Sequence, residues 1–121
     1  MNIEDFRNYC LSLPGVTEDM PFGGDTLVFR VGGKIFALTG ADLFEFANLK
    51  CEPQRAIDLR EQYDGIRPGY HMNKQHWNSV YPGRDVPDAL FCELIEHSYR
   101  LIFNSLSAKD RNAINSGNTE L

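Results

Sequence analysis

The amino-acid sequence predicts an α+β domain with two layers, in which helices cover one face of a largely antiparallel, five-stranded sheet. Two runs of alternating apolar residues flank a pair of glycines, and apolar residues at helical spacing mark three other segments. Most connections are too short to join parallel strands. The predicted order is α-β-β-β-α-β-β-α, which leaves one face of the sheet partly open as a binding surface.

The first predicted element is a helix that ends at Pro14-Gly15. Asn2, with Asp5 three residues later, resembles a helix N-cap signature. The apolar residues that share one face of this helix are Ile3, Phe6, Cys10 and Leu13. The segment that follows, residues 16–25, is predicted to be an irregular loop.

The clearest local signal is "TLVFRVGGKIFALT", residues 26–39. Gly32-Gly33 is typical of a two-residue hairpin turn that requires positive φ. Pairing across this turn predicts Phe29 opposite Phe36 and Leu27 opposite Leu38. The predicted apolar face of the hairpin consists of Leu27, Phe29, Val31, Phe36 and Leu38. A further turn at residues 40–42 then leads to a third predicted strand, "LFEFANLK".

The second half of the chain adds two helices and two strands. Pro53 suits the first turn of a helix that ends at Asp64-Gly65. Residues 65–84 predict two short strands around a turn near Asn73-Lys74. Pro87 begins the longest helix, and Ser107 with Asp110 predicts the cap of one last helical turn. The apolar face of the longest helix consists of Leu90, Phe91, Leu94, Ile95, Leu101 and Ile102.

Length and composition bound the class of protein. The chain has 121 residues and a net charge of −5, which suits a single domain over residues 1–114 with a flexible tail over 115–121. No stretch approaches 18 apolar residues, so no membrane helix is expected. The three cysteines are widely spaced and odd in number, which favours reduced thiols in a cytoplasmic protein.

Residues 65–84, "GIRPGYHMNKQHWNSVYPGR", differ from the rest of this acidic chain. They contain three basic residues, Arg67, Lys74 and Arg84, and no Asp or Glu. They also hold the single tryptophan and two of the three histidines. This composition predicts the core of a second hairpin with a small positive rim, which suits a phosphate backbone, an acidic peptide or neither.

Several motifs together resemble the bacterial MmcQ/YjbR family: "LPGV", "GGKIFAL", "LK" before a helix that begins with Pro, "PGYHMNKQHWNSV" and "SY" in the last helix. The resemblance covers about residues 2–111. It implies an α+β layer with an antiparallel sheet, similar to frataxin-like and secretion-chaperone-like domains. Members of this family are usually described as DNA-binding proteins with a "double wing" motif, so the resemblance implies DNA as a partner.

The sequence gives little support for a metal site or for a catalytic nucleophile. The five-residue spacing of His71 and His76 fits neither one helix face nor one strand face, and there is no Cys-x-x-Cys motif. Cys51 precedes a helix, where a thiol pKa can be lowered, but a small apolar filler is the favoured interpretation. We therefore expect no metal, no cofactor and no enzymatic activity.

The aromatic residues of this segment have two interpretations. Tyr70, Trp77 and Tyr81 are suited to stacking on bases or on a peptide. A core role is favoured for Trp77. The residues assigned to the architecture of the two hairpins are Gly32, Gly33, Tyr70, His71, His76 and Trp77.

Two binding hypotheses follow. In the first, the hairpin tips contact the DNA backbone without reading sequence, through Lys34, Arg67, Asn73, Lys74 and Arg84. In the second, the protein is an adaptor or chaperone-like module that binds a protein or peptide on the open sheet face. The family resemblance favours DNA, whereas the overall acidity favours the adaptor.

Overall fold

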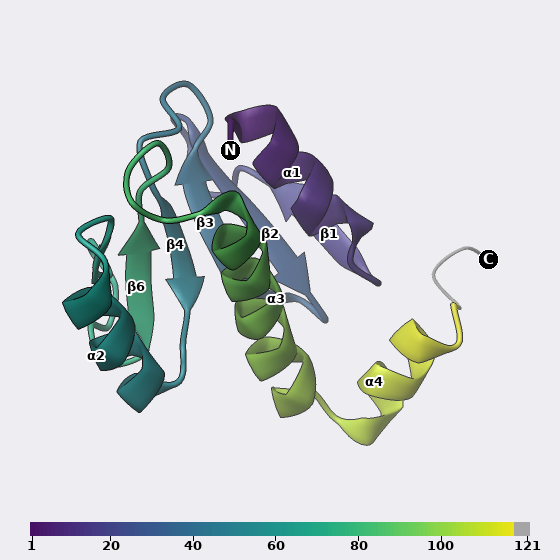
Figure 1. The fold of residues 1–121 in the computed structure, drawn as a ribbon. Coiled ribbons are helices and arrows are strands. Elements are labelled where there is room, and N and C mark those ends of the chain that lie inside the picture. The colour runs from purple at the N-terminus through teal and green to yellow at the C-terminus, as the bar shows by residue number, and fades with distance from the viewer. Residues whose placement is uncertain (118–121) are drawn as a thin grey trace.

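The computed structural model describes residues 1–117 (Figure 1), and within them the chain forms four helices and six strands. The elements in chain order are α1 (Ile3–Ser12), β1 (Val16–Asp19), β2 (Thr26–Val31), β3 (Lys34–Gly40), β4 (Ala47–Lys50), α2 (Pro53–Gln62), β5 (Ile66–Pro68), β6 (Trp77–Val80), α3 (Asp88–Ser105) and α4 (Ala108–Asn115). The predicted α+β class is confirmed. Of the tail expected over residues 115–121, Asn115 still belongs to α4, and residues 118–121 lie outside the described part.

The strands form one sheet in the order β1-β2-β3-β4-β6-β5, and every neighbouring pair is antiparallel. Figure 1 shows α1, α2 and α3 on the same face of this sheet, with α3 running across its middle. The opposite face carries no helix among the described residues, as the sequence predicted. None of the helices in residues 1–117 is both long and apolar enough to cross a bilayer.

The core lies between the sheet and the helices. Phe6 of α1 contacts Phe29 and Phe91 edge-to-face, with ring centroids 5.7 and 6.1 Å apart. Ser98 is buried in the middle of α3, where its hydroxyl donates to Phe36 O (2.6 Å) and accepts from Lys50 N (2.8 Å). This small residue therefore joins α3 directly to two strands.

The hairpin turn at Gly32-Gly33 has the predicted geometry. Gly32 has φ +58° and Gly33 has φ +81°, the left-handed conformation that a two-residue primed turn requires. The tip is also packed against the protein, because a Cβ at Gly32 would lie 2.5 Å from Leu106 Cδ1. Gly33 has no such neighbour.

The predicted pairing in this hairpin is wrong beyond the first two residue pairs. Arg30 faces Ile35, but Phe29 faces Ala37 and not Phe36, because a β-bulge adds one residue to β3. Leu38 consequently pairs with Val28 and lines the open face, whereas Phe29 and Phe36 remain in the core. A single extra residue reverses the face of every later side chain on that strand.

Two other strand predictions are corrected. The segment expected to be an irregular loop contains β1, which pairs with β2 and raises the sheet to six strands. The third strand is limited to Ala47–Lys50. Residues 43–46 instead form part of a loop in which Glu45 N donates to Leu43 O.

Helix caps follow the local sequence. Asn2 Oδ1 accepts from Asp5 N at 2.8 Å, and Ser107 Oγ accepts from Asp110 N at 3.1 Å, as predicted. At the start of α2, the Glu52 carboxylate accepts from Gln54 N and Arg55 N. These caps fix the ends of the helices and hence the loops that leave them.

Candidate binding groove on the open sheet face

A groove with a volume of about 610 Å³ lies on the face of the sheet that lacks helices. Its floor comes from neighbouring strands, since Leu38 of β3 pairs with Asn48 of β4, and Thr26 of β2 pairs with Gly40 of β3. The remaining walls come from three loops. The residues that line the groove are Phe22, Thr26, Ile35, Leu38, Thr39, Gly40, Leu43, Glu45, Phe46, Asn48, Tyr70, His71 and Met72.

One wall is the start of the loop between β5 and β6, which curves back over the sheet. Asn48 Nδ2 donates to Tyr70 O (3.1 Å), and Tyr70 N donates to Ser79 Oγ (2.9 Å). Ser79 Oγ in turn donates to Asn48 Oδ1 at 2.5 Å. Because Asn48 and Ser79 are buried, this closed network holds the wall in place and satisfies both polar side chains.

The same loop contains a strained turn. Met72 N donates to Gly69 O (3.1 Å), and between them His71 has φ +60°, the only positive φ at a non-glycine residue in the described chain. A side chain in this conformation costs about 1–2 kcal/mol. In this conformation the imidazole of His71 lies beside the Tyr70 ring, with centroids 4.0 Å apart.

An aromatic cluster centred on Phe46, itself a lining residue, packs against this wall. Phe46 contacts Tyr70 (5.8 Å between centroids) and Tyr81 (5.3 Å). The guanidinium of Arg84 lies over the Tyr81 ring, 4.7 Å from its centroid, in a cation–π arrangement. The wall therefore consists of aromatic rings that pack against one another, with the Arg84 guanidinium on the outermost ring.

Large apolar side chains stand exposed around the groove. Leu43 is 75% exposed, Phe22 65% and Tyr70 57%, and these three contribute to the lining. Among the described residues the other large apolar side chains with comparable exposure are Met20 and Ile57. An exposed apolar surface concentrated around a hollow is typical of an interaction site.

The two hairpin tips lie at the same end of the sheet. The β2–β3 turn joins Val31 to Lys34. Lys50 ends β4 toward this turn and pairs with Trp77, the first residue of β6. The 69–76 loop therefore leaves the sheet at the Gly32-Gly33 end, so the structure brings together the two tips named in the DNA hypothesis.

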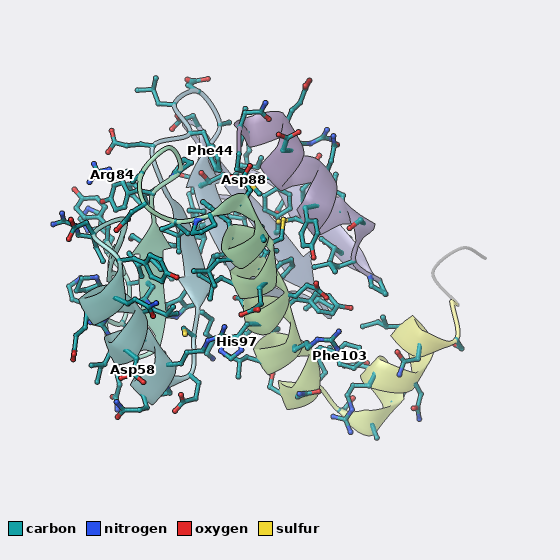
Figure 2. The ribbon with its side chains drawn as sticks, in the orientation of Figure 1. Phe44, Asp58, Arg84, Asp88, His97 and Phe103 are labelled. Atoms are coloured by element: carbon teal, nitrogen blue, oxygen red, sulfur yellow. The ribbon has the colours of Figure 1, made fainter. Side chains whose placement is uncertain are left out.

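The basic side chains named in the DNA hypothesis all contact the protein itself. Lys34 Nζ lies 3.5 Å from Ser105 Oγ, Arg67 Nε donates to Asp64 O, and Lys74 Nζ donates to Gly69 O at 2.8 Å. Asn73 has a structural role, since its Oδ1 accepts from the backbone N–H groups of Gln75 and His76. The Arg84 side chain lies on Tyr81, at the other end of β6 (Figure 2).

Trp77 does not belong to the core. It is half-buried and lies outside the cluster of core residues. Alternation along β6 places it on the same face as Ser79, the open face, while Val80 faces the helices. His76 contributes its backbone carbonyl, which accepts from Cys51 N at 2.8 Å.

Two titratable side chains outside the groove, Cys51 and His97, have structural roles. Burial raises the pKa of the Cys51 thiol to about 11, so this thiol stays protonated at neutral pH and acts as the apolar filler that the sequence favoured. His97 projects from α3 toward the start of α2 (Figure 2), where its Nε2 accepts from Glu52 N. In residues 1–117 no three His, Cys, Asp or Glu side chains gather as metal ligands do.

Sequence reasoning missed most of the groove. Asn48 carries a signal, because a polar residue between Ala47 and Leu49 in a short strand calls for a buried partner. Phe22 carries none, since an apolar residue in a loop is unremarkable without knowledge of its neighbours. Leu43 was predicted to belong to a strand, and its place in a loop hid its role.

Fold and groove together define a small α+β domain with helices on one face of an antiparallel sheet and an open, apolar hollow on the other. The chain belongs to the YjbR family, whose sequence pattern matches residues 11–101. It is 41% identical over 116 residues to YbdF of Escherichia coli O157:H7, with 94% of each chain covered. It is 30% identical over 112 residues to YjbR of Escherichia coli K12, covering 92% of this chain and 95% of that one.

Solved structures agree with this assignment. Protein DR2400 of Deinococcus radiodurans, described with the domain DUF419, has a TM-score of 0.88 at 35% identity, over 94% of this chain and 88% of that chain. A Pseudomonas syringae protein has a TM-score of 0.72 at 30% identity, over 84% of this chain and 99% of that chain. The names of these relatives state no activity.

Proposed function

We propose that this protein is a non-enzymatic binding module that takes an apolar segment of a partner protein into the groove on the open sheet face. The observation that carries the proposal is the combination of a 610 Å³ hollow with a rigid, hydrogen-bonded wall. A preformed wall lowers the entropy lost on binding. The aromatic lining offers large contact area at low entropic cost.

The chemistry of the lining also supports binding over catalysis. Its titratable side chains are Glu45, Tyr70 and His71. The polar groups of Thr39 and Asn48 are used within the protein, since Thr39 Oγ1 donates to Phe46 O and Asn48 bonds to Ser79 and Tyr70. An apolar ligand thus meets a floor on which the side-chain polar groups of Thr39 and Asn48 are already satisfied.

The test compares two exposed apolar residues on opposite layers. Peptides selected from a displayed random library are measured by fluorescence anisotropy against the wild type, Leu43→Gln and the control Ile57→Gln. Leu43 is 75% exposed in the groove wall and Ile57 is 45% exposed on α2. Covering Leu43 should contribute about 1–2 kcal/mol, so Leu43→Gln should weaken binding roughly 5- to 30-fold. Ile57→Gln should leave it unchanged.

Mapping the bound peptide by backbone amide chemical shifts gives the second reading. The proposal expects the largest shifts at residues of β2, β3 and β4 that face the groove. Chemical-shift changes at the helices instead of the groove would contradict this assignment of the site. Equal losses of peptide affinity in Leu43→Gln and Ile57→Gln would contradict it as well.

DNA remains the second candidate, favoured by the position of both hairpin tips at one end of the sheet. Contacts from three or four basic residues should give a log–log salt slope of roughly −3 to −4. Lys34→Gln should flatten that slope by about one unit. The control is Arg100→Gln on α3, where the side chain is 70% exposed. A folded protein that binds neither duplex nor single strand at low salt would end the DNA hypothesis.

A further inference from the structure

Negative charge at one end of the groove favours some apolar partners over others. This inference rests on the binding function proposed above. Glu45 lines the groove. At Gly40, an added Cβ would lie 3.6 Å from Asp25 Oδ2 and 3.1 Å from Leu43 O. Asp42 follows Gly40 by two residues and is exposed. Glu45 therefore lines the hollow and Asp25 lies beside Gly40 at one end of it, while Asp42 is an exposed residue of the adjoining loop.

These carboxylates are not neutralised within the described chain. The side chains of Asp25, Asp42 and Glu45 form no hydrogen bond and no ion pair with any group in residues 1–117. Arg30 pairs across the hairpin with Ile35, one of the lining residues. Its charge is offset by Asp19, whose Oδ1 lies 3.2 Å from Arg30 Nε.

The cations near the wall are also engaged, since Lys74 Nζ donates to Gly69 O at 2.8 Å. Arg84 lies over Tyr81 and is separated from the groove by the Tyr81 and Phe46 rings. The Gly40 end of the groove is therefore negative, next to an apolar floor. Such a surface repels phosphates and acidic peptides, and it attracts cations.

We infer that the occupant of the groove is a partner peptide with bulky apolar residues directly followed or preceded by lysine or arginine. The apolar residues fill the space over Leu38 and beside Tyr70, and the cation reaches the carboxylates near Gly40. A second copy of this chain fits less well, because it brings the same net charge of −5 and the same three carboxylates to the contact. Met72 in the wall adds a flexible apolar side chain that adapts to different apolar partners.

The experiment uses fluorescein-labelled peptides that share one apolar core, taken from the library selection, and differ in their flanks. The flanks are Lys-Lys, Gln-Gln or Glu-Glu, and a labelled DNA duplex is a fourth probe. Each is titrated into the wild-type protein by anisotropy. Two or three solvent-exposed ion pairs should make the Lys-flanked peptide bind about tenfold more tightly than the Gln-flanked one. This preference should shrink between about 0.02 M and about 0.5 M salt.

Two variants of equal net charge locate the effect. The groove variant is Asp25→Asn/Asp42→Asn/Glu45→Gln, which should lose the preference for Lys flanks while still binding the Gln-flanked peptide. The matched control is Glu4→Gln/Asp58→Asn/Glu61→Gln, on α1 and α2, with Asp58 labelled in Figure 2. The control variant should keep the preference for Lys flanks, because the carboxylates that it removes lie on the helical layer.

Each outcome has a distinct meaning. Equal affinity for Lys and Gln flanks overturns the electrostatic inference but leaves the groove as a binding site. A preference kept by the groove variant, or lost equally in the control, overturns the assignment to these three carboxylates. If no peptide binds while the duplex does, the proposed function itself fails and the tips become the site.

Discussion

The two glycines of the β2–β3 turn allow a quantitative test of how the first hairpin tip is packed. Both have positive φ, so alanine at either position carries a backbone penalty of about 1–2 kcal/mol. They differ in surroundings, because the new methyl group at Gly32 would lie 2.5 and 2.7 Å from the two Cδ atoms of Leu106, whereas at Gly33 it meets open space.

At Gly32 the clash with Leu106 adds a packing cost to the backbone penalty. Leu106 is only 5% exposed, so its side chain must displace core neighbours to make room, and overpacking of this kind costs about 1–3 kcal/mol. Gly33→Ala should therefore lower the free energy of unfolding by about 1–2 kcal/mol, and Gly32→Ala by about 2–5 kcal/mol. The difference between the two variants isolates the contact with Leu106.

Urea unfolding followed by Trp77 fluorescence measures both values by linear extrapolation. A double-mutant cycle sharpens the result: in the background of Leu106→Ala, Gly32→Ala should cost no more than Gly33→Ala, because the obstructing side chain is gone. Equal destabilisation of the two single variants in the wild-type background would refute the reasoning. It would mean that the tip does not rest on the end of α3.

Three further predictions concern the groove wall and α3. Ser79→Ala should lower stability by about 1–3 kcal/mol, since it leaves buried partners unsatisfied, and should speed hydrogen exchange at Tyr70 N specifically. His71→Gly should raise thermal stability by relieving about 1 kcal/mol of strain at φ +60° while weakening peptide binding; a stable variant with unchanged binding would show that the imidazole serves no ligand. Burial lowers the pKa of His97 below about 6.5, so its contribution to stability is complete above that pH and is lost as the pH falls through the folded pKa. Urea unfolding at several pH values should show this decline in the wild type, and His97→Gln, whose side chain can still accept from Glu52 N, should remove it.

Features with a local physical cause could be predicted from the sequence alone. The caps at Asn2 and Ser107 need one side chain and one nearby N–H. The Gly32-Gly33 turn needs two residues that tolerate positive φ. The apolar face of α3 follows from helical spacing, and family membership followed from short motifs, because these too are readable over a few residues.

The site depended on contacts between residues far apart in the chain. The bulge at β3 moved Leu38 from the predicted core face to the groove floor, a change of one residue that strand alternation cannot reveal. β1 forms because the edge of β2 offers unpaired backbone groups, not because "VTED" is a strong strand sequence. Phe22, Leu38, Leu43 and Tyr70 line one hollow only after four segments fold together. Sequence periodicity indicates which side chains share a face of a strand. Strand register and loop packing decide whether that face meets the core or the groove. Both depend on contacts between residues far apart in the chain, so a short stretch of sequence does not reveal them.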